Sequence, residues 1–191
     1  VLVGDVRLTP KTLPLIRQRL GLVFQDPDDQ LFMPSVYDDV AFGPRNLLLD
    51  ADEVARRVAD SLTQVGITQL KDRAPFKLSG GEKRSAAIAA VLSLEPDVLI
   101  MDEPTTALDP QSRRRVINLL NSFDHTKIIT SHDLDMVVAT CSRILVIKNG
   151  EIAADGTAAE ILSNQALLED CGLEVPPSMQ NCPVCGTRRG C

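Results

Sequence analysis

Two adjacent carboxylates, Asp102 and Glu103, directly follow an apolar run at residues 98–101. An apolar run that ends in charged and turn residues is typical of a strand buried on both faces of a parallel sheet. Side chains at the carboxyl end of such a strand lie where open α/β sheets bind their ligands. The pair is therefore a candidate ligand site, and the alternative is a strand that simply ends in charged turn residues.

Two more polar residues stand at the ends of predicted strands. Gln25 follows the short apolar segment 22–24 and precedes the turn formers 26–30. Its side-chain oxygen is a candidate neutral ligand for a hard cation such as Mg²⁺, and the alternative is that it satisfies local backbone groups. His132 stands just past the predicted strand 127–130. A histidine at that place in an α/β protein is a candidate for a ligand contact, with an ordinary surface histidine as the alternative.

A predicted helix begins with two glycines. Ser79 and Glu82 form a capping-box pattern around Gly80 and Gly81, and the strongly helix-forming segment 86–94 follows. Each glycine costs about 0.5–1 kcal/mol relative to alanine within a helix. Without side chains, their backbone N–H groups can approach an anion at the positive end of the helix. The alternative is that glycine is only tolerated near a helix start.

Capping patterns and periodicity predict the helices that would position these residues. Asp109 with Pro110 predicts a helix start after the carboxylate strand. Asp50 with Glu53 predicts another start. The apolar stripe that follows has the helical period and ends before a glycine: Val54, Val58, Leu62, Val65 and then Gly66. The segment 41–44 is predicted to be a loop.

A hairpin and a short helix are predicted near the end of this α/β pattern. The segments 143–148 and 151–154 flank an Asn-Gly turn, which predicts the hairpin. Thr157 and Glu160 form a third capping-box pattern, which predicts the helix.

The composition is that of one globular domain with room for a small subdomain: 191 residues, 44% hydrophobic and 24% charged. A net charge of −6 argues against a general nucleic-acid binder, which needs a basic face.

No apolar run approaches the ~20 residues that cross a bilayer. No signal peptide is seen, but the chain begins at Val1, so a signal could be missing rather than absent. Five cysteines, four of them after residue 170, do not match a secreted disulfide framework, which favours a cytosolic compartment.

In chain order, the candidate residues are Gln25, Ser79-Gly80-Gly81-Glu82, Asp102-Glu103, Asp109 and His132. Their types, order and spacing resemble the nucleotide-binding domain of ABC transporters over residues 1–165. Within that family, the segments VFQDPDDQLF, DVAFGPRN and LSGGEKRSAAIAAVL are similar to those of the energy-coupling-factor and cobalt/nickel importer ATPases.

The resemblance implies a fold class and a domain organisation. The fold class is α/β, P-loop NTPase-like (RecA-like), with a mostly parallel sheet flanked by helices. Residues 1–30 and 95–165 would form the catalytic core, with its N-terminal part missing. Residues 31–94 would form the Q-loop and an inserted helical subdomain with the signature segment. Residues 166–191 would be a cysteine-containing C-terminal tail.

For the catalytic residues, the resemblance implies ATP hydrolysis with Mg²⁺. Asp102 would hold Mg²⁺ through water, because Mg²⁺ keeps much of its hydration. Glu103 would orient and polarise the water that attacks the γ-phosphate, since phosphoryl transfer needs positioning more than covalent chemistry. His132 would contact the γ-phosphate, and Gln25 would sense Mg²⁺ and couple the site to a membrane subunit.

The signature segment, residues 79–82, implies a partner. In the family, the matching segment binds the γ-phosphate of the ATP that a second ATPase subunit carries. Here this segment consists of Ser79, Gly80, Gly81 and Glu82, and the second subunit would be either a copy of this chain or a different ATPase. Asp109 matches a residue that communicates across that dimer. ATP would join the two subunits and hydrolysis would let them part, which moves an integral-membrane transporter subunit. The chain would then lie at the cytoplasmic face of the cell membrane, without nucleic acid as a partner.

Two departures from the family pattern stand out. Ser85 occupies a position that is commonly arginine. The 191 residues contain no G-x-x-x-x-G-K-[ST] and no candidate for the adenine-stacking aromatic residue before it. We therefore expect an N-terminally truncated chain that binds ATP poorly alone and is marginally folded. The alternative function is a non-catalytic fragment or regulatory half that offers only its signature segment. A third class is the ATPases of DNA repair or chromosome organisation. The sequence does not support it, because it has no long heptad tract and no basic face.

The cysteine-containing tail has its own alternatives. Cys182 and Cys185 have the C-x₂-C spacing of half a zinc site. A full structural site needs four ligands, so Zn²⁺ would also require Cys191 with Cys171, or a second chain. The alternative is a disordered tail without metal.

Overall fold

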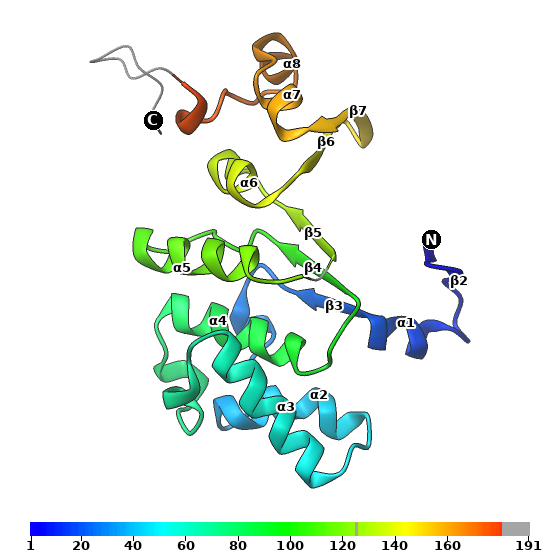
Figure 1. Ribbon diagram of the computed structural model, residues 1–191, viewed down its shortest axis with the longest axis vertical. Helices are drawn as coiled ribbons and strands as arrows, with labels where there is room; N and C mark the ends of the chain where they lie inside the picture. Colours follow the sequence, from blue (N-terminus) through cyan, green and yellow to red (C-terminus); the bar gives the residue numbers. More distant parts are fainter. Residues whose placement is uncertain (125, 181–191) are drawn as a thin grey trace. The chain divides into compact units, whose positions relative to one another are not determined.

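The computed structural model describes residues 1–124 and 126–180, which fall into two compact units, Val1–Thr130 and Ser131–Cys191. Each unit is described by itself (Figure 1). The elements of the first are β1 (Leu2–Val3), β2 (Val6–Arg7), α1 (Leu13–Arg19), β3 (Leu20–Val23), the 3₁₀ helix η1 (Pro27–Asp29), α2 (Val36–Asn46), α3 (Ala51–Gln64), the 3₁₀ helices η2 (Thr68–Leu70) and η3 (Pro75–Lys77), α4 (Gly80–Leu92), β4 (Val98–Asp102), α5 (Pro110–Asn121) and β5 (Thr126–Thr130).

Three parallel strands in the order β3-β4-β5 form the sheet of the first unit. The predicted carboxylate strand is its central strand, and the sheet with its flanking helices confirms the predicted α/β class. The strand predicted at 22–24 begins at Leu20 and ends at Val23. The preceding α1 was not predicted, because Ile16 is its only buried residue and its apolar positions form no stripe of helical period.

The two faces of this sheet differ in their surroundings. One face carries Val23, Leu99 and Met101, which are fully buried. On the other face, Leu22, Ile100 and Ile128 stand opposite one another in register across the three strands. Leu22 is 46% exposed and Ile128 is 53% exposed. Parallel sheets are normally covered on both faces, so this half-exposed apolar row is unusual.

Helices α2, α3 and α4 pack against one another beside the sheet (Figure 1). Val54, Val58 and Leu62 are buried, as the stripe in α3 predicts. The helix ends at Gln64, and Gly66 follows with a φ of 73°. This left-handed conformation is the one that favours glycine after a helix.

The segment 41–44 is helical, and the prediction of a loop there is wrong. Pro44 lies inside α2 and has no N–H, so the carbonyl of Val40 loses its helical donor. The hydroxyl of Ser93, at the end of α4, donates to that carbonyl at 2.8 Å, and the bond is buried. The helix therefore continues because a side chain from another element replaces the missing hydrogen bond.

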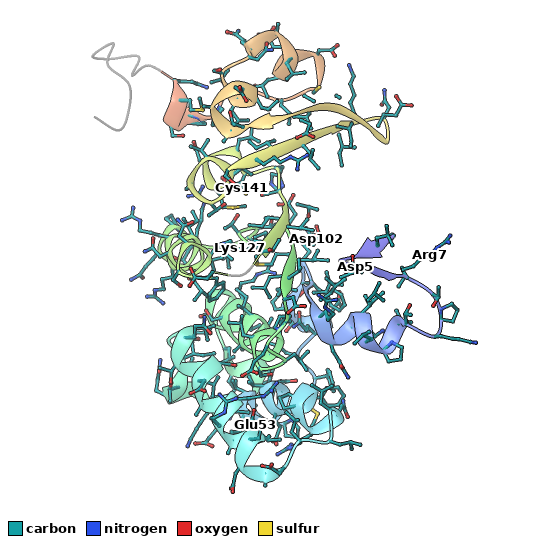
Figure 2. All side chains as sticks on the ribbon, turned by 45° about the vertical axis from the view of Figure 1, so that its right-hand side comes forward. Asp5, Arg7, Glu53, Asp102, Lys127 and Cys141 are labelled. Carbon is teal, nitrogen blue, oxygen red and sulfur yellow. The ribbon has the colours of Figure 1, made fainter. Side chains whose placement is uncertain are left out.

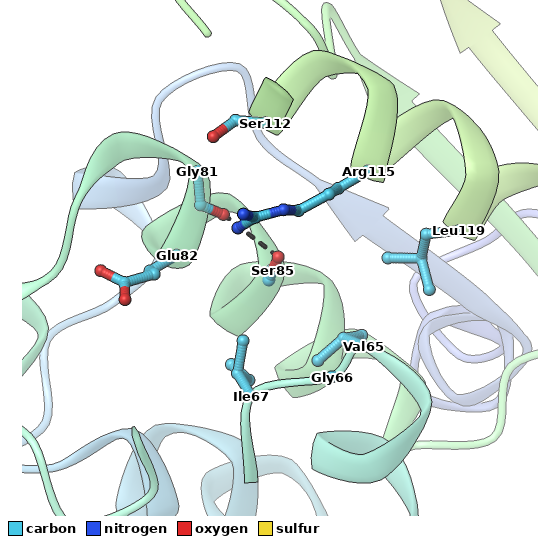
Figure 3. Close-up of a pocket in the computed structure, with 9 residues that line it drawn as sticks. All are labelled: Val65, Gly66, Ile67, Gly81, Glu82, Ser85, Ser112, Arg115 and Leu119. Carbon is cyan, nitrogen blue, oxygen red and sulfur yellow. Dashed lines mark hydrogen bonds between the residues drawn. The ribbon is translucent and has the colours of Figure 1, made fainter. Parts of the chain in front are cut away.

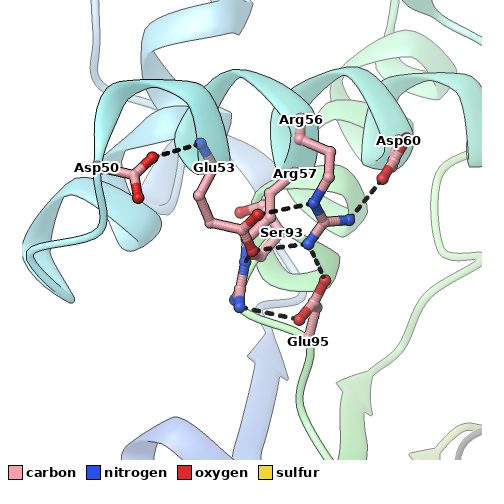
Figure 4. A network of polar contacts seen from close by, with 7 residues as sticks. All are labelled: Asp50, Glu53, Arg56, Arg57, Asp60, Ser93 and Glu95. Atoms are coloured by element: carbon pink, nitrogen blue, oxygen red, sulfur yellow. Dashed lines mark hydrogen bonds and ion pairs between the residues drawn. The ribbon is translucent and has the colours of Figure 1, made fainter.

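A network of ion pairs joins α3 to the turn between α4 and β4 (Figure 4). Glu53 accepts from Arg56 and from Arg57, each at 2.7 Å. The same two arginines reach Glu95 at 3.0 and 2.9 Å. The arginines lower the pKa of Glu53 to about 2. Asp50 caps α3 through the N–H of Glu53, but the Glu53 side chain turns to the arginines instead of completing the predicted capping box.

The second unit contains α6 (Leu134–Thr140), β6 (Arg143–Lys148), β7 (Glu151–Thr157), α7 (Ala158–Leu162), α8 (Gln165–Asp170) and the 3₁₀ helix η4 (Pro177–Met179). β6 and β7 form the predicted antiparallel hairpin. Asn149 and Gly150 have φ values of 53° and 82° at its turn, which suits the mirror-image turns of hairpins. Thr157 and Glu160 form the predicted capping box of α7.

Candidate functional site

An open cleft of about 840 Å³ lies in the first unit, beside the residues that leave the carboxyl ends of β3 and β4. It is lined by Phe24, Gln25, Asp26, Pro27, Asp28, Asp29, Leu78, Gly80, Lys83, Arg84, Asp102, Thr106, Ala107 and Leu108. Gln25, Asp102 and Gly80 come from three distant parts of the sequence. The structure thus brings a predicted cation ligand, a predicted carboxylate and a predicted glycine to one cleft, where open α/β sheets bind ligands.

Asp102 and Glu103 lie at the end of β4, where the sequence predicts them. The Thr130 hydroxyl of β5 donates to Oδ1 of Asp102, and Figure 2 labels Asp102 at the end of β4. Glu103 has a φ of 46°, and its N–H donates to the carbonyl of Thr130 at 3.0 Å. The Thr106 hydroxyl donates to Oε2 of Glu103 at 3.1 Å. Both carboxylates are therefore oriented by threonines of neighbouring segments.

The segment that carries Gln25 is held by α4. The guanidinium of Arg84 donates to the carbonyls of Phe24 and Gln25 at 2.7 and 2.5 Å. Sequence reasoning did not identify Arg84 as a site residue. A signal was present, because Arg84 lies on the same helical stripe as Ile88 and Val91, which are also buried.

The predicted capping box at the start of α4 is confirmed. The Ser79 hydroxyl accepts from the Glu82 N–H at 3.4 Å, and the Glu82 carboxylate accepts from the Ser79 N–H at 2.8 Å. These bonds to Ser79 lower the pKa of Glu82. The carboxylate is therefore ionised at neutral pH and fixed at the positive end of α4.

The two glycines at this helix start have different surroundings. A Cβ at Gly80 would meet nothing within 4 Å, whereas a Cβ at Gly81 would lie 2.3 Å from Oγ of Ser112 in α5. Gly80 therefore leaves space at the first turn of α4, and its predicted contact with an anion stays a prediction. Gly81 is required for the close approach of α4 to α5, a packing reason that the sequence does not reveal.

Asp109 caps α5, as predicted, and accepts from the N–H groups of Gln111 and Ser112 at 2.9 and 3.0 Å. The bonds from Ser112 lower its pKa. A pocket of about 70 Å³ lies between α4 and α5, and Figure 3 shows Arg115 pointing into it beside Gly81 and Ser85. The Ser85 hydroxyl donates back to the Gly81 carbonyl at 3.1 Å. The departure at Ser85 therefore leaves the N–H groups of the signature segment untouched.

His132 lies in the second unit, between β5 and α6. The next residue, Asp133, caps α6 by accepting from the N–H of Met136 at 3.0 Å. Its own N–H donates to the Ser131 hydroxyl at 3.1 Å. The role of His132 toward the carboxylates of the first unit stays a prediction.

The residues of the cleft fit Mg²⁺ and phosphate. The carboxylate of Asp102 and the amide oxygen of Gln25 are hard oxygen donors, which Mg²⁺ prefers. The first N–H groups of a helix have no helical acceptor, and at Gly80 no side chain blocks them. Asp102 and Gln25 would therefore hold the cation, while the signature segment would present N–H groups to a phosphate.

A zinc site is not seen in the described part of the chain. Cys171 and Cys141 are free thiols. No group of three or more His, Cys, Asp or Glu side chains in residues 1–124 and 126–180 is arranged to hold a metal ion. Cys182, Cys185 and Cys191 lie outside the described residues, so the zinc prediction is not tested.

The fold and the cleft together define a class: an α/β protein with an open cleft at the carboxyl ends of parallel strands. The ABC transporter family model matches residues 1–106. An ABC transporter ATP-binding protein of Geobacter sulfurreducens is 59% identical over 97% of this chain and 75% of its own length. The energy-coupling factor transporter ATP-binding protein EcfA of Methanothermobacter thermautotrophicus is 46% identical over 84% of this chain and 53% of its own length.

A solved structure agrees with the sequence comparisons. The structure of cbiO1 from Clostridium perfringens, part of the ABC transporter complex cbiONQ, has a TM-score of 0.79 and 39% identity. The match covers 88% of this chain and 70% of that one. The chain belongs to the ABC transporter ATP-binding family. No helix within residues 1–124 and 126–180 is long and apolar enough to cross a membrane.

Proposed function

We propose that the chain belongs to the ATP-binding and ATP-hydrolysing subunit of an importer. The observation that carries this proposal is the placement of Gln25 and Asp102 in one cleft. An amide oxygen and a carboxylate are hard oxygen donors of the kind that Mg²⁺ prefers, and Mg²⁺ accompanies the phosphates of ATP.

Each residue has a defined role in this proposal. Asp102, oriented by the Thr130 hydroxyl, holds Mg²⁺ through water. Glu103, oriented by Thr106, accepts a hydrogen bond from the attacking water and polarises it. His132 contacts the γ-phosphate. Bound Mg²⁺ neutralises charge on the phosphates, and the chain's residues supply position and orientation.

The proposed partners are a second ATPase subunit and an integral-membrane subunit. The signature segment (79–82) binds the nucleotide of the second subunit, and Asp109 lies beside it on α5, whose Ser112 contacts Gly81. Attachment to the membrane subunit places the chain at the cytoplasmic face of the membrane. The proposed cargo is cobalt, nickel or another energy-coupling-factor substrate, in keeping with the names of EcfA and the cbiONQ complex.

A second candidate function is that the chain contributes only its signature segment. One observation favours it: the helix start at Gly80 is open and capped. In this case Glu103 performs no chemistry, and the chain stimulates a partner that holds the nucleotide.

Two measurements separate these candidates. In the first, ATP hydrolysis by the 191-residue chain is compared with that of Glu103→Gln, with Glu95→Gln as the matched control because Glu95 lies in the ion-pair network instead of the cleft. A loss of about 100-fold or more in Glu103→Gln alone supports the hydrolytic function. In the second, the chain is mixed with the intact Geobacter sulfurreducens relative. Association that requires MgATP, without hydrolysis by the chain, supports the second candidate. Neither activity nor association would contradict both.

A further inference from the structure

Arg84 is a buried cation at the cleft, with only 2% of its surface exposed. In the described part of the chain, no carboxylate forms a salt bridge with it, and its Nε has no hydrogen-bond partner. Burial lowers its pKa, and the nearby Asp26 opposes that effect. A buried arginine that is not neutralised is costly, so its contacts need an explanation beyond general packing.

The contacts of Arg84 are two consecutive main-chain carbonyls. Its Nη1 and Nη2 donate to Phe24 and Gln25 at 2.7 and 2.5 Å. The planar guanidinium presents donors in a fixed fork, which a lysine cannot reproduce. Because both carbonyls are held, the peptide planes around Gln25 are held too, and the direction of its side chain follows.

Two further contacts join α4 to the Gln25 loop, residues 24–30. Lys83 reaches both oxygens of Asp28 at 2.6 and 2.8 Å. The Gln30 side chain donates to the Ala87 carbonyl at 2.9 Å and accepts from the Phe24 N–H at 3.2 Å. Helix α4 therefore holds the beginning, middle and end of this loop, and its own first turn is the signature segment.

We propose that Arg84 is a positioning residue that sets the Gln25 side chain in the cleft and links it to the first turn of α4. The inference rests on the proposed function, in which Gln25 holds a cation. Any displacement of the signature segment by a partner's nucleotide then moves the Gln25 loop directly, because one helix carries both. A lysine at this position keeps the charge and loses the fork.

The first test is amide hydrogen exchange of the 191-residue chain, which needs no ligand. Arg84→Lys is compared with Arg57→Lys, a matched control because Arg57 is also a partly buried arginine that contacts a main-chain carbonyl, that of Ser93. We expect exchange in the Gln25 loop to rise about tenfold in Arg84→Lys and to stay unchanged in Arg57→Lys. Unchanged exchange in Arg84→Lys, or an equal rise in both variants, would overturn the proposal.

The second test is the affinity of the chain for Mn²⁺ in the presence of ATP, measured by equilibrium dialysis in which the Mn²⁺ and the ATP retained with the chain are both determined. Arg84→Lys and Gln25→Ala should each weaken binding about tenfold, and the double variant should be no weaker than Gln25→Ala. If Arg84 had only a structural role, the loss of Mn²⁺ affinity in the double variant would be the sum of the losses in the two single variants. Additive effects would therefore overturn the proposal.

The two tests separate failure of the inference from failure of the proposed function. If the wild-type chain binds no Mn²⁺ with ATP while the loop exchanges faster in Arg84→Lys, the metal role of Gln25 is wrong and the positioning role of Arg84 stands. If Mn²⁺ binds with ATP and Arg84→Lys changes neither exchange nor affinity, the positioning role is wrong and the proposed function stands.

Discussion

Gly80→Ala and Gly81→Ala are the same chemical change at neighbouring positions, and we expect them to alter stability in opposite directions. Neither glycine has a positive φ, so alanine fits both backbones. Alanine reduces the entropy of the unfolded chain, which stabilises the protein by about 0.4–1 kcal/mol where the native conformation is compatible. This gain applies equally to the two variants and cancels in their difference.

The difference between the variants comes from packing against α5. The added Cβ meets nothing within 4 Å at Gly80, but at Gly81 it would lie 2.3 Å from Oγ and 2.6 Å from Cβ of Ser112. Overpacking of this kind costs about 1–3 kcal/mol. Gly80→Ala should therefore raise the free energy of unfolding, and Gly81→Ala should lower it.

Thermal unfolding of the two variants measures this difference. For a chain of this size, 1 kcal/mol corresponds to roughly 2–4 °C in Tm, so the variants should differ by roughly 2–12 °C. Ser112→Gly removes both clashing atoms, and in that background Gly81→Ala should become as favourable as Gly80→Ala. Equal Tm values for the two glycine variants, or no rescue by Ser112→Gly, would refute this reasoning.

Two further predictions concern stability. The pKa of Glu53 is lowered from 4.5 to about 2, so the stability that its ionisation contributes is present above pH 4.5 and is lost as the pH falls toward 2. Glu53→Gln should lower Tm at pH 7 and have little effect near pH 2; an equal loss at both pH values would contradict this. Ser93→Ala removes the donor to the Val40 carbonyl and should cost about 1–3 kcal/mol in urea unfolding. Pro44→Ala restores a main-chain donor and should reduce that cost; an unchanged cost in this background would contradict the account.

Local signals predicted the elements that carry the candidate site residues. The apolar run before Asp102 and the caps at Ser79 and Asp109 depend on neighbours within a few residues of the chain, and the structure has them as predicted. Capping and strand burial are visible in sequence because the interacting groups are close in it.

The features that were missed depend on partners far along the chain. The helix through Pro44 needs a hydroxyl from Ser93, and the carbonyls that explain the burial of Arg84 come from a segment about 60 residues earlier. Likewise, Gly81 is explained by Ser112 in a different helix. Pairings of this kind are set by tertiary packing, which local propensity does not encode.

The most direct test of the proposed function uses Gly80→Asp, measured by MgATP-dependent association with the intact Geobacter sulfurreducens relative. The position has open space, and a carboxylate in the first turn of a helix is favourable, so the variant should be at least as stable as the wild-type chain. The same carboxylate would repel a bound phosphate. We predict that the wild-type chain associates with MgATP but not with MgADP, and that Gly80→Asp does not associate. Undiminished association of Gly80→Asp would contradict a phosphate-binding role for the signature segment.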